Sequence, residues 1–223
     1  MDGLDEWVLA ELPEVPARVL EIGCGRGELA SALEAAGHDV LAIDPVAPAG
    51  PIFRQIPLEQ LGDVGAFDAV VASLSLHHIH DLRAAVERIA ELAPLLIVNE
   101  FGWDLVDQAT TAWYEGRRRE LLRSGLRPEG GPASAWEEEH RGLHRYETMR
   151  AELERRFRTR SSVRGPHLYR SLCGTSTEPL ERALIDAGAI AAIGWRAVYV
   201  SPTFSQLPGS SVLGRMARSD ATG

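Results

Sequence analysis

Apolar runs alternate with amphipathic stretches through the first half of the chain. Four of these runs are almost wholly apolar and predict strands buried on both faces of a sheet: 19–22, 39–43, 67–73 and 95–99. A weaker run at 52–56 predicts a further strand. Between the runs, 28–36 and 82–92 carry apolar residues at helical spacing, and Asp81 stands where a helix N-cap is expected. This alternation predicts a parallel sheet built from βαβ units.

The pattern changes after residue 100. Helices are expected at 104–123 and 135–157, separated by a loop that is rich in Gly and Pro. Shorter elements follow, in this order: a strand at 159–163, a helix at 178–187 and a last strand at 191–200. We therefore expect a single domain over 1–204, with a helical insertion at about 104–157 that serves as a lid or substrate wall. The tail at 205–223, rich in Gly, Ser and small residues, is predicted to be flexible.

A turn with three glycines joins the first predicted strand to the first predicted helix. Gly23, Gly25 and Gly27 stand at alternate positions, and glycine lets a ligand approach the backbone closely. The spacing argues against a nicotinamide-dinucleotide fingerprint, because Glu28 stands where that motif has its third glycine. A P-loop is excluded, since the chain contains no lysine. The turn is predicted to cradle a ligand, and the alternative is a tight βα turn without one.

Asp44 ends the second predicted strand, 17 residues after Gly27. In open α/β sheets, ligands lie beyond the carboxyl ends of the strands, where a carboxylate accepts hydrogen bonds from both ribose hydroxyls. The alternative is an aspartate that only caps a helix or a turn. Together with the glycine turn, Asp44 favours a ligand that contains a nucleoside.

Four features occur together in this half of the chain: Glu21-x-Gly23-x-Gly25-x-Gly27, Asp44, Phe67-Asp68 and the segment VVASLSLHHIHDL. This set resembles the class I S-adenosylmethionine-dependent methyltransferases, whose motif I has that glycine pattern. The resemblance covers about 19–100 well and 178–200 loosely. It implies a Rossmann-like α/β fold with a doubly wound, mostly parallel seven-stranded sheet and the helical insertion after strand five. It also implies S-adenosylmethionine as the cofactor and methyl transfer to a small-molecule acceptor, with O- or N-methylation favoured.

The resemblance further implies which residues bind the cofactor: Glu21, Gly23, Cys24, Gly25, Gly27, Asp44, Pro45, Pro57, Leu58, Ser73 and Leu74. In such a site, the backbone carbonyls near Ser73 and Leu74 receive the ammonium group of the methionine moiety. The chain departs from the family at Ile56, where an acid that binds adenine is expected. Adenine is therefore expected to be held by apolar packing and backbone amides near Pro57 and Leu58, with Glu59 as an alternative acid.

Three histidines, His77, His78 and His80, follow the fourth predicted strand, where the resemblance places the transferable methyl group. Imidazole is the natural base there for a hydroxyl or amine acceptor near neutral pH. His78 is the first candidate for this catalytic role and His77 the second, because His78 matches the family's paired histidines. A structural role stays open. Zinc is disfavoured, since no cysteine or nearby carboxylate accompanies the histidines, and no metal site is expected.

Candidate contacts to the substrate follow the fifth predicted strand. Trp103, Tyr114 and Arg117 are the residues predicted for this role, and packing within the insertion is the alternative for the two aromatic side chains. From Arg117 to Arg170 the chain holds 14 Arg against 8 Glu and no Asp, a local charge of +6. This segment predicts either an anionic small-molecule substrate or a solvated, salt-bridged helical surface.

Bulk composition narrows the class of protein. The 223 residues carry a net charge of −9, which argues against general affinity for nucleic acid or anionic membranes. Two cysteines make no disulfide framework, and no apolar stretch is long enough to span a bilayer, so a cytoplasmic protein is expected. A non-catalytic protein of the same fold that binds S-adenosylmethionine is the main alternative, and an NAD-dependent oxidoreductase a weaker one. The oligomeric state stays open.

Overall fold

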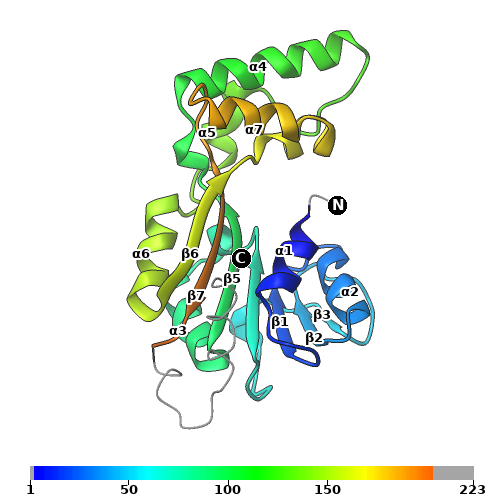
Figure 1. Cartoon of the computed structure of the whole chain (residues 1–223), viewed down its shortest axis with the longest axis vertical. Helices are drawn as coiled ribbons and strands as arrows, with labels where there is room; N and C mark the ends of the chain where they lie inside the picture. The colour runs from blue at the N-terminus through cyan, green and yellow to red at the C-terminus, as the bar shows by residue number, and fades with distance from the viewer. Residues whose placement is uncertain (1–2, 203–223) are drawn as a thin grey trace, which may run out of the picture.

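The structure, a computed structural model, describes residues 3–202 and is built around a sheet of seven strands (Figure 1). The strands are β1 (Arg18–Ile22), β2 (Asp39–Ile43), β3 (Phe53–Arg54), β4 (Ala69–Ser73), β5 (Leu95–Phe101), β6 (Arg158–Gly165) and β7 (Gly194–Val200). Their order is β3-β2-β1-β4-β5-β7-β6, and neighbours are parallel except for β7, which is antiparallel to β5 and β6. The predicted mostly parallel, Rossmann-like sheet is confirmed. The predicted tail lies outside the described residues.

Seven α-helices are found in the described residues: α1 (Leu4–Glu11), α2 (Glu28–Ala35), α3 (Leu82–Leu92), α4 (Gln108–Arg123), α5 (Trp136–Glu139), α6 (Tyr146–Arg156) and α7 (Glu178–Asp186). Short 3₁₀ turns lie between them: η1 (Leu58–Gln60), η2 (Leu76–His78), η3 (Trp103–Leu105), η4 (Ala133–Ala135), η5 (Leu168–Ser171) and η6 (Gly174–Ser176). The predicted N-cap of α3 is confirmed, because the Asp81 carboxylate accepts a hydrogen bond from the Ala84 amide at 2.9 Å.

Both faces of the sheet are covered by helices, which explains why its central strands are apolar runs. Every residue of β5 is buried. Leu95 and Ile97 join a cluster with α1 and α2, whereas Leu96 and Val98 join a cluster with α3 and α6. A parallel strand in this position meets hydrophobic side chains on both faces, so it needs no polar alternation.

Helices α4, α5 and α7 gather beyond one end of the sheet, at the top of Figure 1. With η5 they form a unit that we call the cap. A third hydrophobic cluster fills it, and Phe101 at the end of β5 belongs to that cluster together with Tyr114 and Leu168. The side chain of Phe101 therefore connects the sheet to the cap.

One helix of the predicted insertion belongs to the sheet rather than to the cap. Residues 135–157 were expected to form one helix, but α5 and α6 are separate, and α6 buries Met149 and Leu153 in the core cluster on the α3 side. The break at 140–145 is fixed by tertiary hydrogen bonds, such as the one from the His144 amide to the His77 carbonyl oxygen at 3.0 Å. Local helix propensity yields to these contacts.

Three smaller differences concern element bounds. The weak third strand shortens to two residues, because the chain turns away before Pro57. Strand β6 is longer than expected. It is largely exposed and therefore polar, so the hydrophobic pattern of its sequence does not indicate its pairing with β7. Helix α1 was not expected, and its buried Val8 docks it on the sheet.

Replacing Met149 with Ala tests whether α6 is a layer of the core. Met149 is fully buried, so Met149→Ala leaves a cavity and is expected to lower the free energy of unfolding by about 2–5 kcal/mol. The control is Thr148→Ala on the exposed side of the same helix, with an expected change within about 0.5 kcal/mol. Urea denaturation followed by circular dichroism measures both. Equal, small changes would contradict the docking of α6.

Candidate functional site

The glycine turn between β1 and α2 leaves one position open to a ligand. A Cβ atom at Gly23 would clash with the Ser75 side chain, and one at Gly27 would clash with the Phe53 ring, so packing requires both glycines. Gly25 is different, because a Cβ there would meet no atom within 4 Å while its φ of +51° lies in the left-handed region. The turn thus approaches its own core at two glycines and faces open space at the third.

Asp44 lies beside this open position. Its Oδ2 accepts a hydrogen bond from the Gly25 amide at 3.0 Å, and its Oδ1 accepts one from the Val46 amide at 2.8 Å. The carboxylate is therefore held at the carboxyl end of β2, next to the turn that follows β1. Pro45, the next residue, is exposed.

Glu21 is an acid buried in β1 below the turn. It is 2% exposed, and its Oε2 has no hydrogen-bond partner in the described residues. Burial, with smaller contributions from the charges of Asp44 and Glu28, raises the pKa of Glu21 to about 7. Burial likewise raises the pKa of the Cys24 thiol to about 12, so this side chain stays protonated.

The backbone is unusual where β4 ends. Leu74 has a φ of +50°, which is costly for a residue with a γ-branched side chain, and its amide donates to the Asn99 carbonyl oxygen at 2.8 Å. The Asn99 side chain donates to Ser73 Oγ at 3.0 Å. The ends of β4 and β5 are thus fixed to each other. Near β3, Leu58 is buried in the core, Pro57 and Ile56 are partly buried, and Glu59 is exposed.

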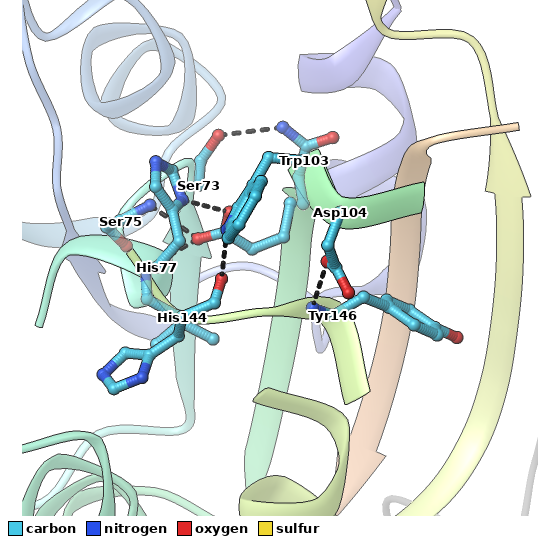
Figure 2. A network of polar contacts seen from close by, with 10 residues as sticks. Ser73, Ser75, His77, Trp103, Asp104, His144 and Tyr146 are labelled. Atoms are coloured by element: carbon cyan, nitrogen blue, oxygen red, sulfur yellow. Dashed lines mark hydrogen bonds and ion pairs between the residues drawn. The ribbon is translucent and has the colours of Figure 1, made fainter. Parts of the chain in front are cut away.

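The buried carboxylate of Glu100 organises the turn after β4, in which Figure 2 labels Ser75 and His77. Glu100 Oε1 accepts hydrogen bonds from the amides of Ser75 and Leu76 at 2.7 and 2.6 Å, and Oε2 lies 2.6 Å from His77 Nδ1. Glu100 and His77 are 1% and 5% exposed, respectively. His77 is therefore locked in place by Glu100.

His78 is exposed and is the last residue of η2, the turn that follows β4. Its ring centroid is 4.1 Å from that of His77, and the charges of Asp44 and His140 both act on it. Burial of part of the ring, followed by the neighbouring His77, lowers the pKa of His78 below its ordinary value. The imidazole of His78 is therefore neutral at physiological pH, as a base must be.

Two histidines of this region were not predicted. His167 stacks on Phe101 with ring centroids 4.1 Å apart, and His140 lies 5.6 Å from the same ring. Glu181 holds the His167 segment, since its buried carboxylate accepts hydrogen bonds from the amides of His167, Leu168 and Tyr169. Neither histidine belongs to a sequence motif, so only the folded chain brings them to the end of β5.

The larger cavity lies in the cap and has a volume of about 380 Å³. Trp103 and Tyr114, two of the predicted substrate contacts, line it together with Trp136 and Arg145. Arg117 does not line it, and its guanidinium pairs with Glu120 at 2.6 Å along α4. The structure therefore brings the two aromatic candidates together and leaves the arginine outside.

The indole and phenol groups of this cavity are already hydrogen-bonded. Trp103 Nε1 donates to the His144 carbonyl oxygen at 3.2 Å, as drawn in Figure 2, and Trp136 Nε1 donates to the Trp103 carbonyl oxygen at 2.9 Å. The Tyr114 hydroxyl donates to the Gly131 carbonyl oxygen at 3.0 Å.

Within residues 3–202, no group of three or more His, Cys, Asp or Glu side chains is arranged to hold a metal ion.

The same residues hold no helix that is long and apolar enough to cross a membrane.

Comparison with known proteins decides the family. A family model described as a methyltransferase domain matches residues 3–158, which is more than half of the chain. The chain belongs to this methyltransferase family. The resemblance to the class I S-adenosylmethionine-dependent enzymes is thereby confirmed, and S-adenosylmethionine is the cofactor of that family.

Two curated methyltransferases show the sequence similarity. An uncharacterized methyltransferase of Mycobacterium tuberculosis is 38% identical over 86 residues, which is 33% of this chain and 44% of that protein. The ubiquinone biosynthesis O-methyltransferase of Xanthomonas axonopodis pv. citri is 32% identical over 102 residues, which is 39% of this chain and 43% of that protein. The chain thus matches less than half the length of these relatives.

Solved methyltransferase structures share the fold. An S-adenosylmethionine-dependent methyltransferase of Mesorhizobium loti has a TM-score of 0.55 at 17% identity, covering 89% of this chain and 99% of that chain. The 1,6-didemethyltoxoflavin-N1-methyltransferase of Burkholderia thailandensis has a TM-score of 0.50 at 21% identity, covering 83% and 71%. At such identities the likeness shows the fold alone.

The acid of motif I gives this methyltransferase a pH-dependent stability. Folded Glu21 has a pKa near 7, above its ordinary 4.5, so the unfolded chain binds fewer protons between these values. The free energy of unfolding of the ligand-free protein is therefore expected to fall, by about 3 kcal/mol, as the pH rises through that window. Glu21→Gln should remove this part of the slope, as measured by urea denaturation at pH 4.5 and pH 8.

Glu34→Gln is the matched control, because Glu34 is an exposed acid on α2, the helix that follows the glycine turn. It should retain the wild-type pH dependence. An unchanged slope in Glu21→Gln would show that the burial of Glu21 does not control the titration.

Proposed function

We propose that the protein transfers a methyl group from S-adenosylmethionine to a small-molecule acceptor. The observation that carries this proposal is the open face of Gly25 beside the fixed carboxylate of Asp44, at the carboxyl ends of β1 and β2. A nucleoside fits there, because the backbone admits close approach and the carboxylate accepts from ribose hydroxyls. The relative from Xanthomonas is named an O-methyltransferase, which favours a hydroxyl acceptor over an amine.

Residues of the glycine turn and of the neighbouring strand ends are proposed to bind the remainder of the cofactor. The buried Glu21 oxygen without a partner in the described residues can accept a hydrogen bond from the ammonium group of a cationic ligand, and the positive charge of that ligand would favour the ionised carboxylate. Ser73 and the strained Leu74 are proposed to receive the methionine end, and Pro57 and Leu58 the adenine. Gly23, Cys24, Gly27 and Pro45 shape the turn. Strain at Leu74 is consistent with a backbone positioned for a ligand.

His78 is proposed as the base that accepts the proton of the acceptor. S-adenosylmethionine supplies the activated methyl group and its own leaving group. His78 is neutral, exposed and adjacent to both the glycine turn and the cap, so it can take a proton from a hydroxyl as the methyl group is transferred. His77 and Glu100 keep the η2 turn, and hence His78, in position.

The acceptor is proposed to carry a negative charge. Support comes from the local charge of +6 between Arg117 and Arg170 and from Arg145 in the larger cavity, where its guanidinium lies 5.7 Å from the Trp103 ring. Trp103 and Tyr114 are proposed as walls for this acceptor, and residues 104–145 as its lid. Arg117 is left with the solvated surface of α4. Both described cysteines are free thiols, which supports the cytoplasm as the compartment.

Cofactor binding is tested by isothermal titration with S-adenosylhomocysteine, S-adenosylmethionine and NAD. The wild type is expected to bind the first two and not NAD. Gly25→Val should abolish binding, because its side chain fills the open face of the turn, and Asp44→Ala should weaken it by about 1–3 kcal/mol.

Gly188→Val is the control for strain, since Gly188 has a similar φ of +68° and equally open surroundings, but follows α7. It should bind the cofactor like the wild type. Tight binding of NAD without binding of S-adenosylhomocysteine would overturn the proposed function.

A panel of phenols and amines is first screened with S-adenosylmethionine that carries a labelled methyl group. A compound that becomes labelled is then the substrate on which the role of His78 is tested. His78→Ala should lower kcat about 100-fold or more with little change in cofactor affinity, since a base acts in the transition state. The rate of the wild type should fall at acidic pH with an apparent pKa below 6.5, because protonation removes the base. His80→Ala, an exposed histidine two residues later, is the control. Equal kcat values in both variants would leave His78 without a catalytic role.

A further inference from the structure

A second, smaller cavity lies where β5, β6 and β7 meet α7 and η5. Its volume is about 120 Å³, and four arginines contribute to its lining: Arg164, Arg170, Arg182 and Arg196. Gly165 and Gly194, at the paired ends of β6 and β7, form part of its floor. No sequence motif marks this site, since its arginines come from four separate elements.

The cavity carries a surplus of positive charge. Its lining holds two carboxylates, and both are engaged. Glu100 binds the turn after β4, and Glu178 pairs with Arg182 at 2.6 Å. Arg196 has no carboxylate within 4 Å among the described residues. Its Nε lies 3.4 Å from Asn99 Oδ1, and its guanidinium lies 5.2 Å from the Trp7 ring.

The position of the cavity separates it from the proposed nucleoside site. Gly25 and Asp44 follow β1 and β2, whereas the cavity begins at β5 and extends towards the β6 edge of the sheet. Neighbouring strands are about 4.8 Å apart, so β1 and β5, which are separated by β4, lie about 10 Å from each other. If the methionine end of the cofactor is held at Ser73 on β4, as proposed, the cavity would lie on its far side from the nucleoside site. In-line methyl transfer requires the acceptor on the side of the methyl group that faces away from the rest of the cofactor.

Asn99 connects the two regions. It lines the cavity, contacts Arg196 through its carbonyl oxygen and donates its amide to Ser73 Oγ at the end of β4. A group bound by Arg196 is thus separated only by Asn99 from Ser73, at the strand end proposed to receive the methionine end of the cofactor. His167, stacked on Phe101, forms another part of the wall.

We propose that this cavity binds a carboxylate of the methyl acceptor, with Arg196 as its principal partner and Arg182 as the second. The inference rests on the proposed function. A volume of about 120 Å³ is small for an entire ligand but suits a single acidic group, and guanidinium groups match the two oxygens of a carboxylate. The acceptor is therefore a hydroxy or amino acid whose reacting atom points towards His78.

The probe for this site is acetate, titrated at constant ionic strength and followed by the backbone amide resonances of Gly165 and Gly194. The titration is run on the free protein and on the protein saturated with S-adenosylhomocysteine. We expect saturable shifts in both cases. Arg196→Gln should weaken acetate binding about tenfold or more, and Arg182→Gln less. Arg155→Gln is the matched control, because Arg155 pairs with Glu152 on α6 much as Arg182 pairs with Glu178 on α7.

Each other outcome has a distinct meaning. Shifts that do not saturate, or that Arg155→Gln changes as much as Arg196→Gln, overturn the carboxylate site. Loss of acetate binding once S-adenosylhomocysteine is bound, with weaker S-adenosylhomocysteine binding in Arg196→Gln, shows that the arginine holds the cofactor's own carboxylate and overturns the assignment to the acceptor. Failure of the wild type to bind S-adenosylhomocysteine overturns the proposed function, whereas acetate binding by the free protein is still measured independently.

Discussion

The carboxylate of Glu100 is the contact on which the candidate site depends. It is buried at the end of β5 and receives two backbone amides and one imidazole from the turn that follows β4. Burying a carboxylate without hydrogen-bond partners is costly, and here each of its oxygens has a short hydrogen bond to the turn after β4. The conformation of the turn is consequently fixed by its hydrogen bonds to β5, and not by its own sequence alone. Because His78 is the last residue of this turn, the same hydrogen bonds determine its position.

A second buried carboxylate does the same work for the cap. Glu181 on α7 collects three successive amides of the segment that begins η5, and so holds His167 against Phe101. Each acid holds a histidine whose ring lies against Phe101, the residue through which the sheet meets the cap: Glu100 holds His77, and Glu181 holds His167. Each carboxylate accepts hydrogen bonds from successive backbone amides, and this restricts the conformation of the segment to which those amides belong.

The parts of this structure that sequence could predict are those governed by local pattern. Strands β1, β2, β4 and β5 are predictable from apolar runs, because they are largely buried and most of their side chains are apolar. The N-cap role of Asp81 follows from a local capping rule. The glycine turn is read from its spacing. Other parts depend on distant residues. The break before α6 is imposed by His77 and Trp103, and the exposed strand β6 is held by pairing with β7.

The candidate site divides in the same way. Asp44 and the glycines are close in sequence to elements that place them, so their proximity is predictable. His140, His167 and the arginines around Arg196 come together through cap packing and antiparallel pairing at the sheet edge, which no short motif encodes. Arg117 is a different case, because the local charge that suggested it says nothing about its partner, Glu120, or about its place outside the lining of the larger cavity.

The aromatic walls of the larger cavity set limits on what it can distinguish. Trp103, Trp136 and Tyr114 already donate their N–H and O–H hydrogens to backbone carbonyls, so these three side chains offer a guest ring faces and edges, and the Tyr114 oxygen as an acceptor, but no free donor. Aromatic walls of this kind tell ligands apart mainly by size and outline, and they discriminate weakly against a close isostere. Drift of this enzyme towards new acceptors would therefore proceed by reshaping the aromatic walls, while the acid and imidazole framework at the strand ends stays unaltered.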